Sequence, residues 1–436
     1  MDNATQLVFR IYLWFCVVAL IVYLPRISFY LVAFRKQERL RSSEKHRIAV
    51  IVPARDEQAV ISHCLDSLAS QTYDPRCFDI HLVIADEADP TAQIASAYER
   101  CSVTVIGGQT CKGEALDGVL KKILAQTPDA YDAFLFLDAD NLAAPDLLEE
   151  MNNALSSGRQ IVCGKKLIKN WQSGRRASRS FIANCTALTY TQIDELGNRA
   201  RNHLGLSVTM VGTGMLVRAD VIRENGGWPY RSLTEDYEMT ADAIVKGWTS
   251  LYYSHAQVFT EEACDARSAF KRKMRWIKGY TQCQRRYFSV ILKKVLAGHI
   301  RWRNLGFLFA TFPPYAFFAV SAVAMIFGFV ALASSLLFGT VGLAPALRMV
   351  LLPFLFIYGV LFVYTLVPLF VDRAQVKISW PEKIAVLFGN PLYTLGYFRI
   401  FLTAFVTSDD HFAWESTARF STGIFADFTD KLEESV

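Results

Sequence analysis

Apolar runs of different lengths divide this chain into three parts. From Leu7 to Phe34 hardly any polar side chain interrupts the sequence, whereas between Arg47 and Phe259 short Val- and Ile-rich runs alternate with helix-like stretches. After Asn304 long apolar segments return. Continuous apolar stretches of about 20 residues are typical of membrane helices, and the alternating pattern is typical of a mostly parallel sheet covered by helices. The pattern predicts an α/β domain inserted between membrane segments.

The first apolar segment predicts a retained membrane anchor. It is longer than the core of a signal peptide, and no small-residue cleavage site follows it. A basic run comes directly afterwards, formed by Arg35, Lys36, Arg39, Arg41 and Lys45. Because positively charged loops stay on the cytoplasmic side, we expect the α/β domain to lie in the cytosol.

The C-terminal third predicts two further membrane helices. No charged residue occurs between Asn304 and Arg348, or from there to Asp372, which is enough for a helical pair joined by a short outside loop. The stretch 287–302 before them resembles an interfacial helix. A last apolar segment, Ile384–Thr407, either crosses the membrane or lies in its interface, and the sequence leaves that topology open.

Polar residues follow the predicted strands at the points where a ligand is expected. Four runs predict strands, namely Ile48–Val52, His81–Ala85, Val103–Ile106 and Phe134–Leu137. Ligands of open α/β sheets bind beyond the carboxyl ends of the strands. The residues found there are Pro53, Arg55, Glu57 and Asp86, then Lys112 in a segment that opens a helix, and finally Asp138 and Asp140.

The pair Asp138 and Asp140 predicts a divalent cation. An Asp-x-Asp turn after an apolar strand offers two oxygen ligands and leaves positions open for phosphate oxygens and water, as Mg²⁺ prefers. Clustered carboxylates are also unfavourable without a counter-ion. We therefore expect Mg²⁺ or Mn²⁺ at this pair, although solvated turns carry the same motif.

Two later motifs suggest group transfer. Asp236 lies in the run Leu233-Thr-Glu-Asp-Tyr237, and its carboxylate could take a proton from a hydroxyl group. Arg272 and Arg275 could hold a diphosphate, and Trp276 offers a flat face for a sugar ring. Each motif alone has a simpler explanation, as a helix cap or as the basic flank of a membrane segment.

In their order and spacing, these motifs resemble the membrane-integrated family-2 glycosyltransferases. The similarity is strongest to the processive synthases of cellulose, chitin, hyaluronan and poly-N-acetylglucosamine, and it covers about Arg47 to Tyr287. It implies a GT-A type, Rossmann-like domain between N- and C-terminal transmembrane helices. The implied reaction is inverting, metal-dependent transfer from a nucleotide sugar, expected to be a UDP-sugar, to a growing glycan.

The resemblance also implies a role for each motif residue. Pro53, Arg55, Glu57 and Asp86 would line the nucleotide, Lys112 would approach the donor phosphates, and Asp138 and Asp140 would hold the metal. Asp236 would be the general base and Glu235 would shape the site, with Arg272, Arg275 and Trp276 completing it. The turn Val211–Met215 would approach the acceptor.

One alternative to a polymer synthase stays open, and a second is disfavoured. A secreting synthase encloses its polymer in more helices than the three or four predicted here, so transfer to a membrane lipid is the alternative, as in the similar ceramide glucosyltransferases. An inactive scaffold is disfavoured because the Asp-x-Asp pair and the base are both intact. Seven basic residues between Lys271 and Arg286 could suggest nucleic acid, but they precede a membrane segment and we expect no such partner. We expect the outer charges of this run to face lipid, while Arg272 and Arg275 face the site.

The expected organisation has four parts. They are an anchor over 1–45, a cytosolic glycosyltransferase domain over 46–284, interfacial and transmembrane helices over 285–408, and a cytosolic tail over 409–436. In that tail Trp414, Thr417 and Arg419 resemble an element that covers the donor pocket. A hydrophobic content of 52% agrees with a multi-pass protein of the inner (cytoplasmic) membrane, in contact with membrane lipids. A homo-oligomer or a secretion partner is left open.

Overall fold

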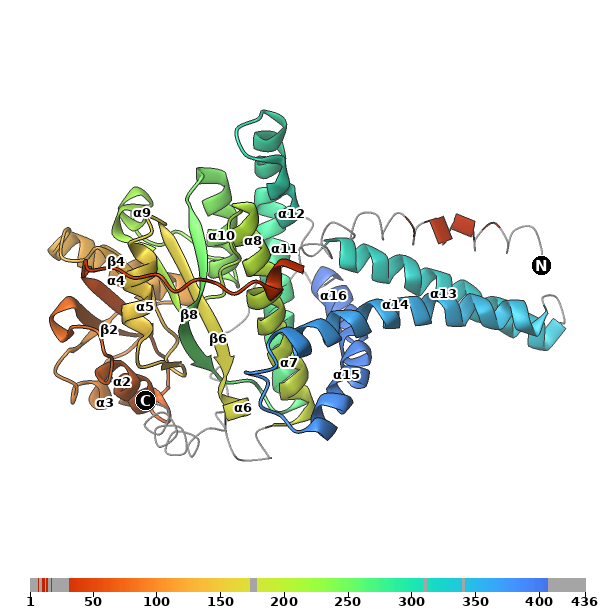
Figure 1. Cartoon of the computed structure of the whole chain (residues 1–436), viewed down its shortest axis with the longest axis horizontal. Helices are drawn as coiled ribbons and strands as arrows, with labels where there is room; N and C mark the ends of the chain where they lie inside the picture. Colours follow the sequence, from red (N-terminus) through yellow and green to blue (C-terminus); the bar gives the residue numbers. More distant parts are fainter. Residues whose placement is uncertain are drawn as a thin grey trace.

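An eight-stranded sheet forms the centre of the molecule (Figure 1). The computed structural model describes residues 31–172, 179–308, 312–338 and 342–406, together with single positions between 7 and 17. The strands are β1 (Ile48–Pro53), β2 (Phe78–Ile84), β3 (Cys101–Val105), β4 (Ala133–Phe136), β5 (Leu142–Ala143), β6 (Ile161–Ile168), β7 (Met215–Arg218) and β8 (Ser250–Thr260). Their order in the sheet is β3-β2-β1-β4-β7-β6-β8-β5.

The first half of the sheet is the parallel half. Strands β3, β2, β1 and β4 pair in parallel, so their carboxyl ends lie at one edge. The four predicted strands are confirmed, with β2 beginning earlier than expected, at Phe78. In the second half, β7 runs antiparallel to both β4 and β6, β6 and β8 are parallel, and β5 is antiparallel to β8.

Side chains alternate between two cores, one on each face of the sheet. In β1, Ile48, Val50 and Val52 belong to one core and Ala49 and Ile51 to the other. This alternation has the period of two that an extended strand imposes. The first core includes α2 (Ile61–Ala69) and α5 (Leu147–Leu155), and the second includes α4 (Lys112–Gln126) and α10 (Glu235–Lys246).

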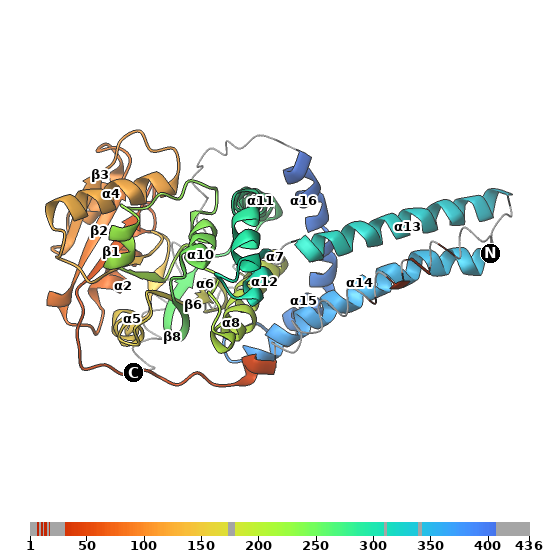
Figure 2. The same cartoon turned by 90° about the horizontal axis from the view of Figure 1, so that it is seen from above.

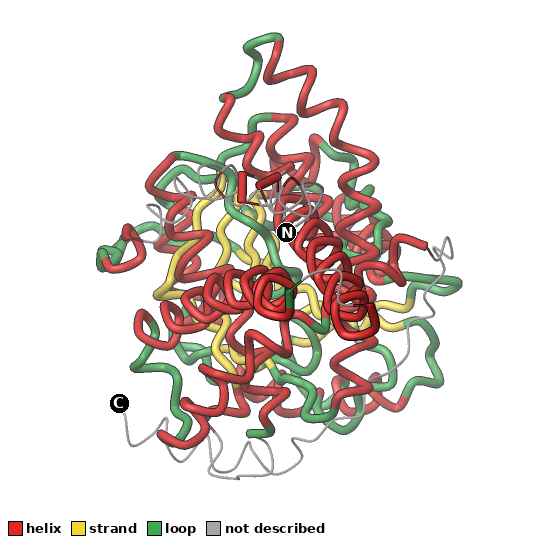
Figure 3. Tube along the Cα trace, turned by 90° about the vertical axis from the view of Figure 1, so that its right-hand side faces the viewer, coloured by secondary structure: helices red, strands yellow, loops and turns green. Residues whose placement is uncertain are grey.

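Further helices lie around the sheet or against α11, and Figure 3 shows helices on both sides of the strands. They are α3 (Pro90–Ala95), α6 (Lys169–Gln172), α7 (Phe181–Thr191), α8 (Arg199–Leu204), α9 (Ala219–Glu224) and α12 (Leu305–Leu308). A π-helical segment, Gln192–Asn198, joins α7 to α8. Short 3-10 turns occur at Leu31–Phe34, Pro75–Cys77 and Trp302–Asn304.

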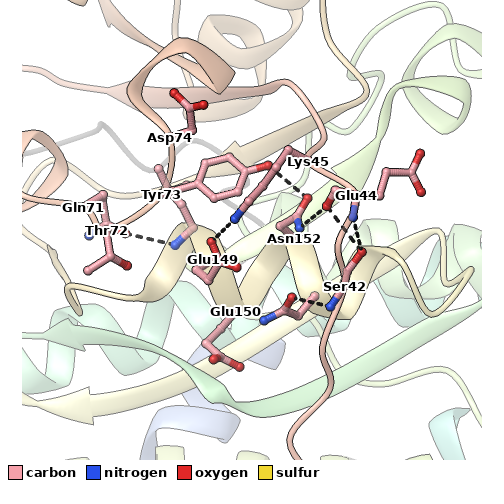
Figure 4. A network of polar contacts seen from close by, with 12 residues as sticks. Ser42, Glu44, Lys45, Gln71, Thr72, Tyr73, Asp74, Glu149, Glu150 and Asn152 are labelled. Atoms are coloured by element: carbon pink, nitrogen blue, oxygen red, sulfur yellow. Dashed lines mark hydrogen bonds and ion pairs between the residues drawn. The ribbon is translucent and has the colours of Figure 1, made fainter.

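The basic linker before β1 is fixed to α5 by polar contacts (Figure 4). Asn152 donates to the Glu44 carbonyl over 2.8 Å and accepts from the Tyr73 hydroxyl over 3.0 Å. Lys45 pairs with Glu149, and Arg39 pairs with Asp146 and Glu150. Arg39 and Lys45 therefore pair with carboxylates of the sheet domain, on α5 and just before it.

A single long helix, α11 (Ala266–Leu296, 31 residues), carries the basic motif. The segment 287–302, expected as a separate interfacial helix, is for the most part the continuation of α11. The outer basic residues were also expected to face lipid, but Lys273 and Lys278 are buried and Arg286 pairs with Glu238. The reason is that α10 and α12 pack on α11, as do α7 and α16 (Tyr397–Val406).

Two apolar helices run side by side away from the sheet (Figures 1 and 2). They are α13 (Phe312–Phe338) and α14 (Leu343–Val371). Within the residues whose side chains are described, one helix, α14, is long and apolar enough by composition to cross a bilayer, and α13 supplies a shorter apolar stretch, Val323–Phe338. Two helices are thus present where the membrane pair was predicted, and their crossing of a membrane stays a prediction.

The last apolar segment is divided into two helices. These are α15 (Trp380–Leu395, 16 residues) and α16 (10 residues), each shorter than the about 20 residues of a full crossing. The predicted anchor before Leu31 and the tail with Trp414, Thr417 and Arg419 lie outside the continuously described residues. The domain boundaries stay predictions, and the one after 284 falls within α11.

Candidate active site

The ammonium group of Lys112 lies close to one backbone oxygen and two side-chain oxygens. They lie at the edge of the sheet where the parallel strands end. Lys112 is the first residue of α4, which begins where predicted. Its ammonium group lies 2.6 Å from Asp138 Oδ1, 2.9 Å from the Gly212 carbonyl oxygen and 3.5 Å from Glu235 Oε1. Burial lowers the pKa of Lys112, but the carboxylates of Asp138 and Glu235 outweigh this and raise it above its usual value.

The predicted glycine turn Val211–Met215 lies next to Lys112 and Asp236. Gly212 has a φ of +68°, a conformation that favours glycine, and a Cβ added there would lie 3.0 Å from Asp236 Oδ2. The next residue, Thr213, accepts a hydrogen bond from the Asp138 backbone N–H over 3.1 Å. The turn therefore brings the Asp-x-Asp segment and Asp236 together, and leaves little room for a larger residue at 212.

Asp236 lies in the first turn of α10, directly after Glu235. Burial raises the pKa of Asp236 to about 7, and the Glu235 carboxylate adds to this rise, while Lys112 and Arg275 act in the opposite direction. A carboxyl group with such a pKa can exchange a proton near neutral pH. We call Lys112, Asp138, Glu235 and Asp236 the Lys112 cluster.

Helix α11 is held against the start of α10 at close range. A Cβ added to Gly279 would lie 2.4 Å from Thr234 Oγ1, so only glycine allows this approach. The Leu233 backbone N–H also donates to Gln282 Oε1 over 3.0 Å. These contacts fix the helix that carries Arg275 and Trp276 relative to Asp236.

Arg272 pairs with a glutamate that the sequence motifs did not single out. Its Nη1 donates to Glu262 Oε1 over 2.8 Å and to the Glu261 carbonyl oxygen over 3.2 Å. Glu262 is fully buried and follows β8, and burial raises its pKa although Arg272 opposes the rise. The signal that could have identified Glu262 is the same as for Asp138, namely a carboxylate at a strand end.

Trp276 packs on α7 by ring contacts. Its ring is perpendicular to that of Tyr190, at a centroid distance of 6.1 Å and an angle of 85°. Arg272 and Lys273 both lie near the ring, at 6.0 Å and 4.6 Å from its centroid. Trp276 is partly exposed, so part of this residue is accessible to another molecule.

The residues expected along the nucleotide form a separate group at the ends of β1 and β2. Asp86 is exposed and accepts from the Ala88 backbone N–H over 3.0 Å. Asp56 has a φ of +56° and its N–H donates to Asp89 Oδ2 over 3.0 Å, which joins the two strand-end loops. Arg55 and Glu57 flank that contact, and Pro53 is the last residue of β1.

The metal prediction rests on two carboxylates. No three His, Cys, Asp or Glu side chains gather as a ready-made metal site among the described residues. Asp140 is buried and receives a hydrogen bond from Asn141 over 3.3 Å, while Asp138 is directed toward Lys112. One or two carboxylates together with substrate phosphates are a normal ligand set for Mg²⁺, so these residues fit a cation that arrives with a diphosphate.

A second group of buried charges lies on β6, and we call it the β6 ion network. Lys165 Nζ lies 2.7 Å from Asp372 Oδ1 and 3.0 Å from Glu195 Oε1, and Glu195 also pairs with Arg199. Lys166 Nζ lies 3.5 Å from Asp194 Oδ1. Because Asp372 follows α14, this network ties the end of the longest apolar helix to the sheet.

Comparison with known families gives one match over more than half of the chain. The model described as glycosyl transferase family group 2 matches residues 133–371, from β4 to the end of α14.

Two curated relatives have different acceptors in their names. A beta-monoglucosyldiacylglycerol synthase of Trichormus variabilis is 23% identical over 273 residues, which is 60% of this chain and 54% of the relative. A probable glucomannan 4-beta-mannosyltransferase of Oryza sativa is 30% identical over 101 residues, 23% of this chain and 18% of the relative. The chain thus spans about half the length of the first relative and 18% of the second.

A solved structure is similar over most of both chains. It is the mannosyltransferase PcManGT of Pyrobaculum calidifontis in complex with GDP-Man and Mn²⁺, with a TM-score of 0.54 and 15% identity, covering 87% of this chain and 96% of the other. This likeness shows a GT-A-like α/β fold.

Proposed function

The chain belongs to glycosyl transferase family group 2, and on that premise we propose that it transfers a sugar from a nucleotide sugar to the hydroxyl group of a membrane lipid. The observation that carries the chemistry is the Lys112 cluster, in which a carboxyl group with a raised pKa lies beside a half-buried ammonium group at the strand ends. The names of the relatives support a lipid acceptor better than a polymer.

The proposed reaction is a single displacement with inversion. Asp236 accepts the proton of the acceptor hydroxyl while that oxygen bonds to the anomeric carbon and the nucleoside diphosphate leaves. A divalent cation held by Asp138 and Asp140 would neutralise charge on the diphosphate when bound. Lys112, Arg272 and Arg275 add positive charge on the same side, where the leaving group gains negative charge.

Donor binding is assigned to the strand-end loops. Pro53, Arg55, Glu57 and Asp86 lie at the carboxyl ends of β1 and β2, next to the end of β4 that carries Asp138. We expect a uridine nucleotide in this place, as the resemblance of the motifs implies. Glu235 has a supporting role, because its carboxylate orients Lys112 and raises the pKa of Asp236.

A lipid acceptor is supported by the position of the apolar helices. Helices α15 and α16 lie near Trp276, and both expose large apolar side chains, among them Ile384, Phe388 and Leu402. A diacylglycerol acceptor held in a bilayer could meet the site from this side. We propose a multi-pass protein of the inner membrane with its catalytic domain in the cytosol, for which α14 is the best candidate span.

A growing glycan is the second candidate acceptor. The match to a glucomannan mannosyltransferase over 101 residues favours it, because that relative extends a polysaccharide by name. The two candidates differ in the product, which a partition experiment separates.

The test is radiolabel transfer by the purified protein in lipid discs that contain diacylglycerol. UDP-sugars and GDP-mannose are supplied in turn with Mg²⁺ or Mn²⁺, and the products are resolved by solvent partition and by size. We expect label in the lipid phase as one discrete species, loss of transfer with a chelator, and recovery when the metal is restored. Asp236→Asn serves as the matched inactive control.

A water-soluble ladder or long polymer, absent in the control variant, would overturn the lipid assignment in favour of the glycan. Transfer that continues at full rate with a chelator would overturn the metal proposal. The absence of any product with every donor would count against the transferase proposal itself.

A further inference from the structure

Lys273 is a buried basic residue that the reaction described above does not use. It lies in α11 between Arg272 and Trp276, and only 5% of its surface is exposed. A buried ammonium group is costly unless other groups stabilise it. Its neighbours therefore indicate what the charge does.

The neighbours of Lys273 are aromatic rings and one hydroxyl group. Its ammonium nitrogen lies 4.6 Å from the centroid of Trp276 and 5.2 Å from the centroid of Tyr397 in α16. It also donates to Thr189 Oγ1 of α7 over 3.2 Å. One cation thus contacts three helices, and two of its contacts are faces of electron-rich rings, which attract cations.

The ring of Trp276 is held from a second direction. Tyr190 of α7 meets it edge-on, and Tyr397 in turn packs on Tyr393 of α15 at a centroid distance of 5.2 Å. Tyr393 is bonded to α7 through Thr186, over 3.2 Å. Rings and cation together form a continuous layer between α7, α11, α15 and α16.

We propose that Lys273 is a positioning residue whose ammonium group fixes the plane of the Trp276 indole for contact with the acceptor. This inference rests on the proposed function, in which a lipid acceptor reaches the site from the side of α15 and α16, where Trp276 lies. Trp276 is partly exposed, and a ring fixed before binding loses less freedom when the acceptor arrives. Without the cation, the same ring would have to be ordered by the acceptor.

The protonation of Lys273 can be followed without measuring sugar transfer. Burial lowers the pKa of Lys273 to about 8, Arg272 lowers it further, and the Glu262 carboxylate opposes both. The other titratable groups that face it are Cys185, Tyr190 and Tyr397, and burial raises the pKa of each of them. The ammonium group therefore loses its proton in a range where those three groups do not titrate.

The kinetic experiment compares three variants in discs with UDP-glucose and diacylglycerol as probes. Lys273→Met removes the cation, Lys273→Arg keeps it, and Lys271→Met makes the same change at an exposed position of the same helix turn. We expect Lys273→Met to raise the KM for diacylglycerol about tenfold with kcat within about twofold. Lys273→Arg should recover most of this effect, and Lys271→Met should match the wild type.

The second experiment follows the emission of Trp276, taken as the difference between the wild type and Trp276→Phe, from pH 6.5 to 9.5. We expect a transition near pH 8 that is lost in Lys273→Met and kept in Lys271→Met. A transition that survives in Lys273→Met would show that another group causes it and would overturn the contact.

An equal fall of kcat in Lys273→Met and Lys273→Arg, or a loss of thermal stability in both, would show a general packing role and overturn the proposal. If the wild type transfers no sugar to diacylglycerol, the acceptor assignment fails, and the emission experiment still decides whether Lys273 orders the indole.

Discussion

The Lys112 cluster and the β6 ion network are both groups of interacting charges, but the first is only partly buried, and only the second is buried and balanced. In the β6 ion network three cations, Lys165, Lys166 and Arg199, meet three carboxylates. In the Lys112 cluster a single ammonium group pairs with Asp138 and Glu235, and Asp236 lies beside them. The balanced group has the properties of a structural element, while the other has an excess of negative charge that a bound cation would relieve.

Paired and unpaired charges affect a protein in different ways. Paired charges in a low-dielectric interior stabilise one another, so removing one partner is costly. A carboxylate without a full counter-charge has a raised pKa, which is costly to the fold but useful for accepting a proton. Changes in the β6 ion network should therefore affect stability, whereas changes in the Lys112 cluster should affect turnover.

The largest effect is expected in the β6 ion network. Lys165→Met leaves Asp372 without its partner, and we expect a loss of about 3–5 kcal/mol in the free energy of unfolding. Thermal unfolding of the purified protein measures it. The double change Lys165→Met with Asp372→Leu should recover much of the loss, because it removes both charges. An unchanged unfolding temperature in Lys165→Met would show that the pair does not tie α14 to the sheet.

Asp236→Asn should lower activity rather than stability, in contrast to Lys165→Met. We expect kcat to fall by about two to three powers of ten, because the proton acceptor is removed. Since the folded-state pKa of Asp236 is raised, its contribution to stability is lost as pH rises from about 4 to about 7. At pH 8 the variant should be at least as stable as the wild type. If the variant lost stability and kept its activity, Asp236 would be a structural residue, like those of the β6 ion network.

The smallest effect is a shift of the pH profile. With the metal held saturating, kcat/KM should fall below about pH 7 as Asp236 becomes protonated. Glu235→Gln removes a like charge and should move this acid limb to lower pH, whereas Lys112→Met should move it to higher pH, each by about one unit. Profiles recorded at constant ionic strength measure both. Shifts in the same direction for both variants would contradict the assignment of the limb to Asp236.

Much of the sheet domain could be predicted from the sequence. The strands β1 to β4 are short apolar runs that end at polar residues, and the helix that begins at Lys112 follows directly. These features are local, because strand and helix periodicity is written into a few consecutive residues. The same locality explains why Asp138 and Asp236 could be singled out before their distance was known.

The helical region was less predictable, because hydrophobicity does not specify what a segment packs against. Lys273, Lys278 and Arg286 were expected at a lipid surface, yet they are buried or paired since α11 is covered by four helices. The break at Gly396, which divides the last apolar segment, has no equivalent in the hydropathy pattern. Glu262 was missed because its partner Arg272 lies in the next element and the pair forms only on folding.

By itself, the sequence determined the α/β class, the strands of the parallel half and the choice of candidate site residues, because these depend on local pattern and chemistry. Only the tertiary structure decided which charges meet: that Lys112 lies between Asp138 and Glu235, that Gly212 faces Asp236, and that Asp372 pairs with Lys165. Ion pairing depends on distances between residues far apart in the chain, and those distances are set by the packing of the whole fold.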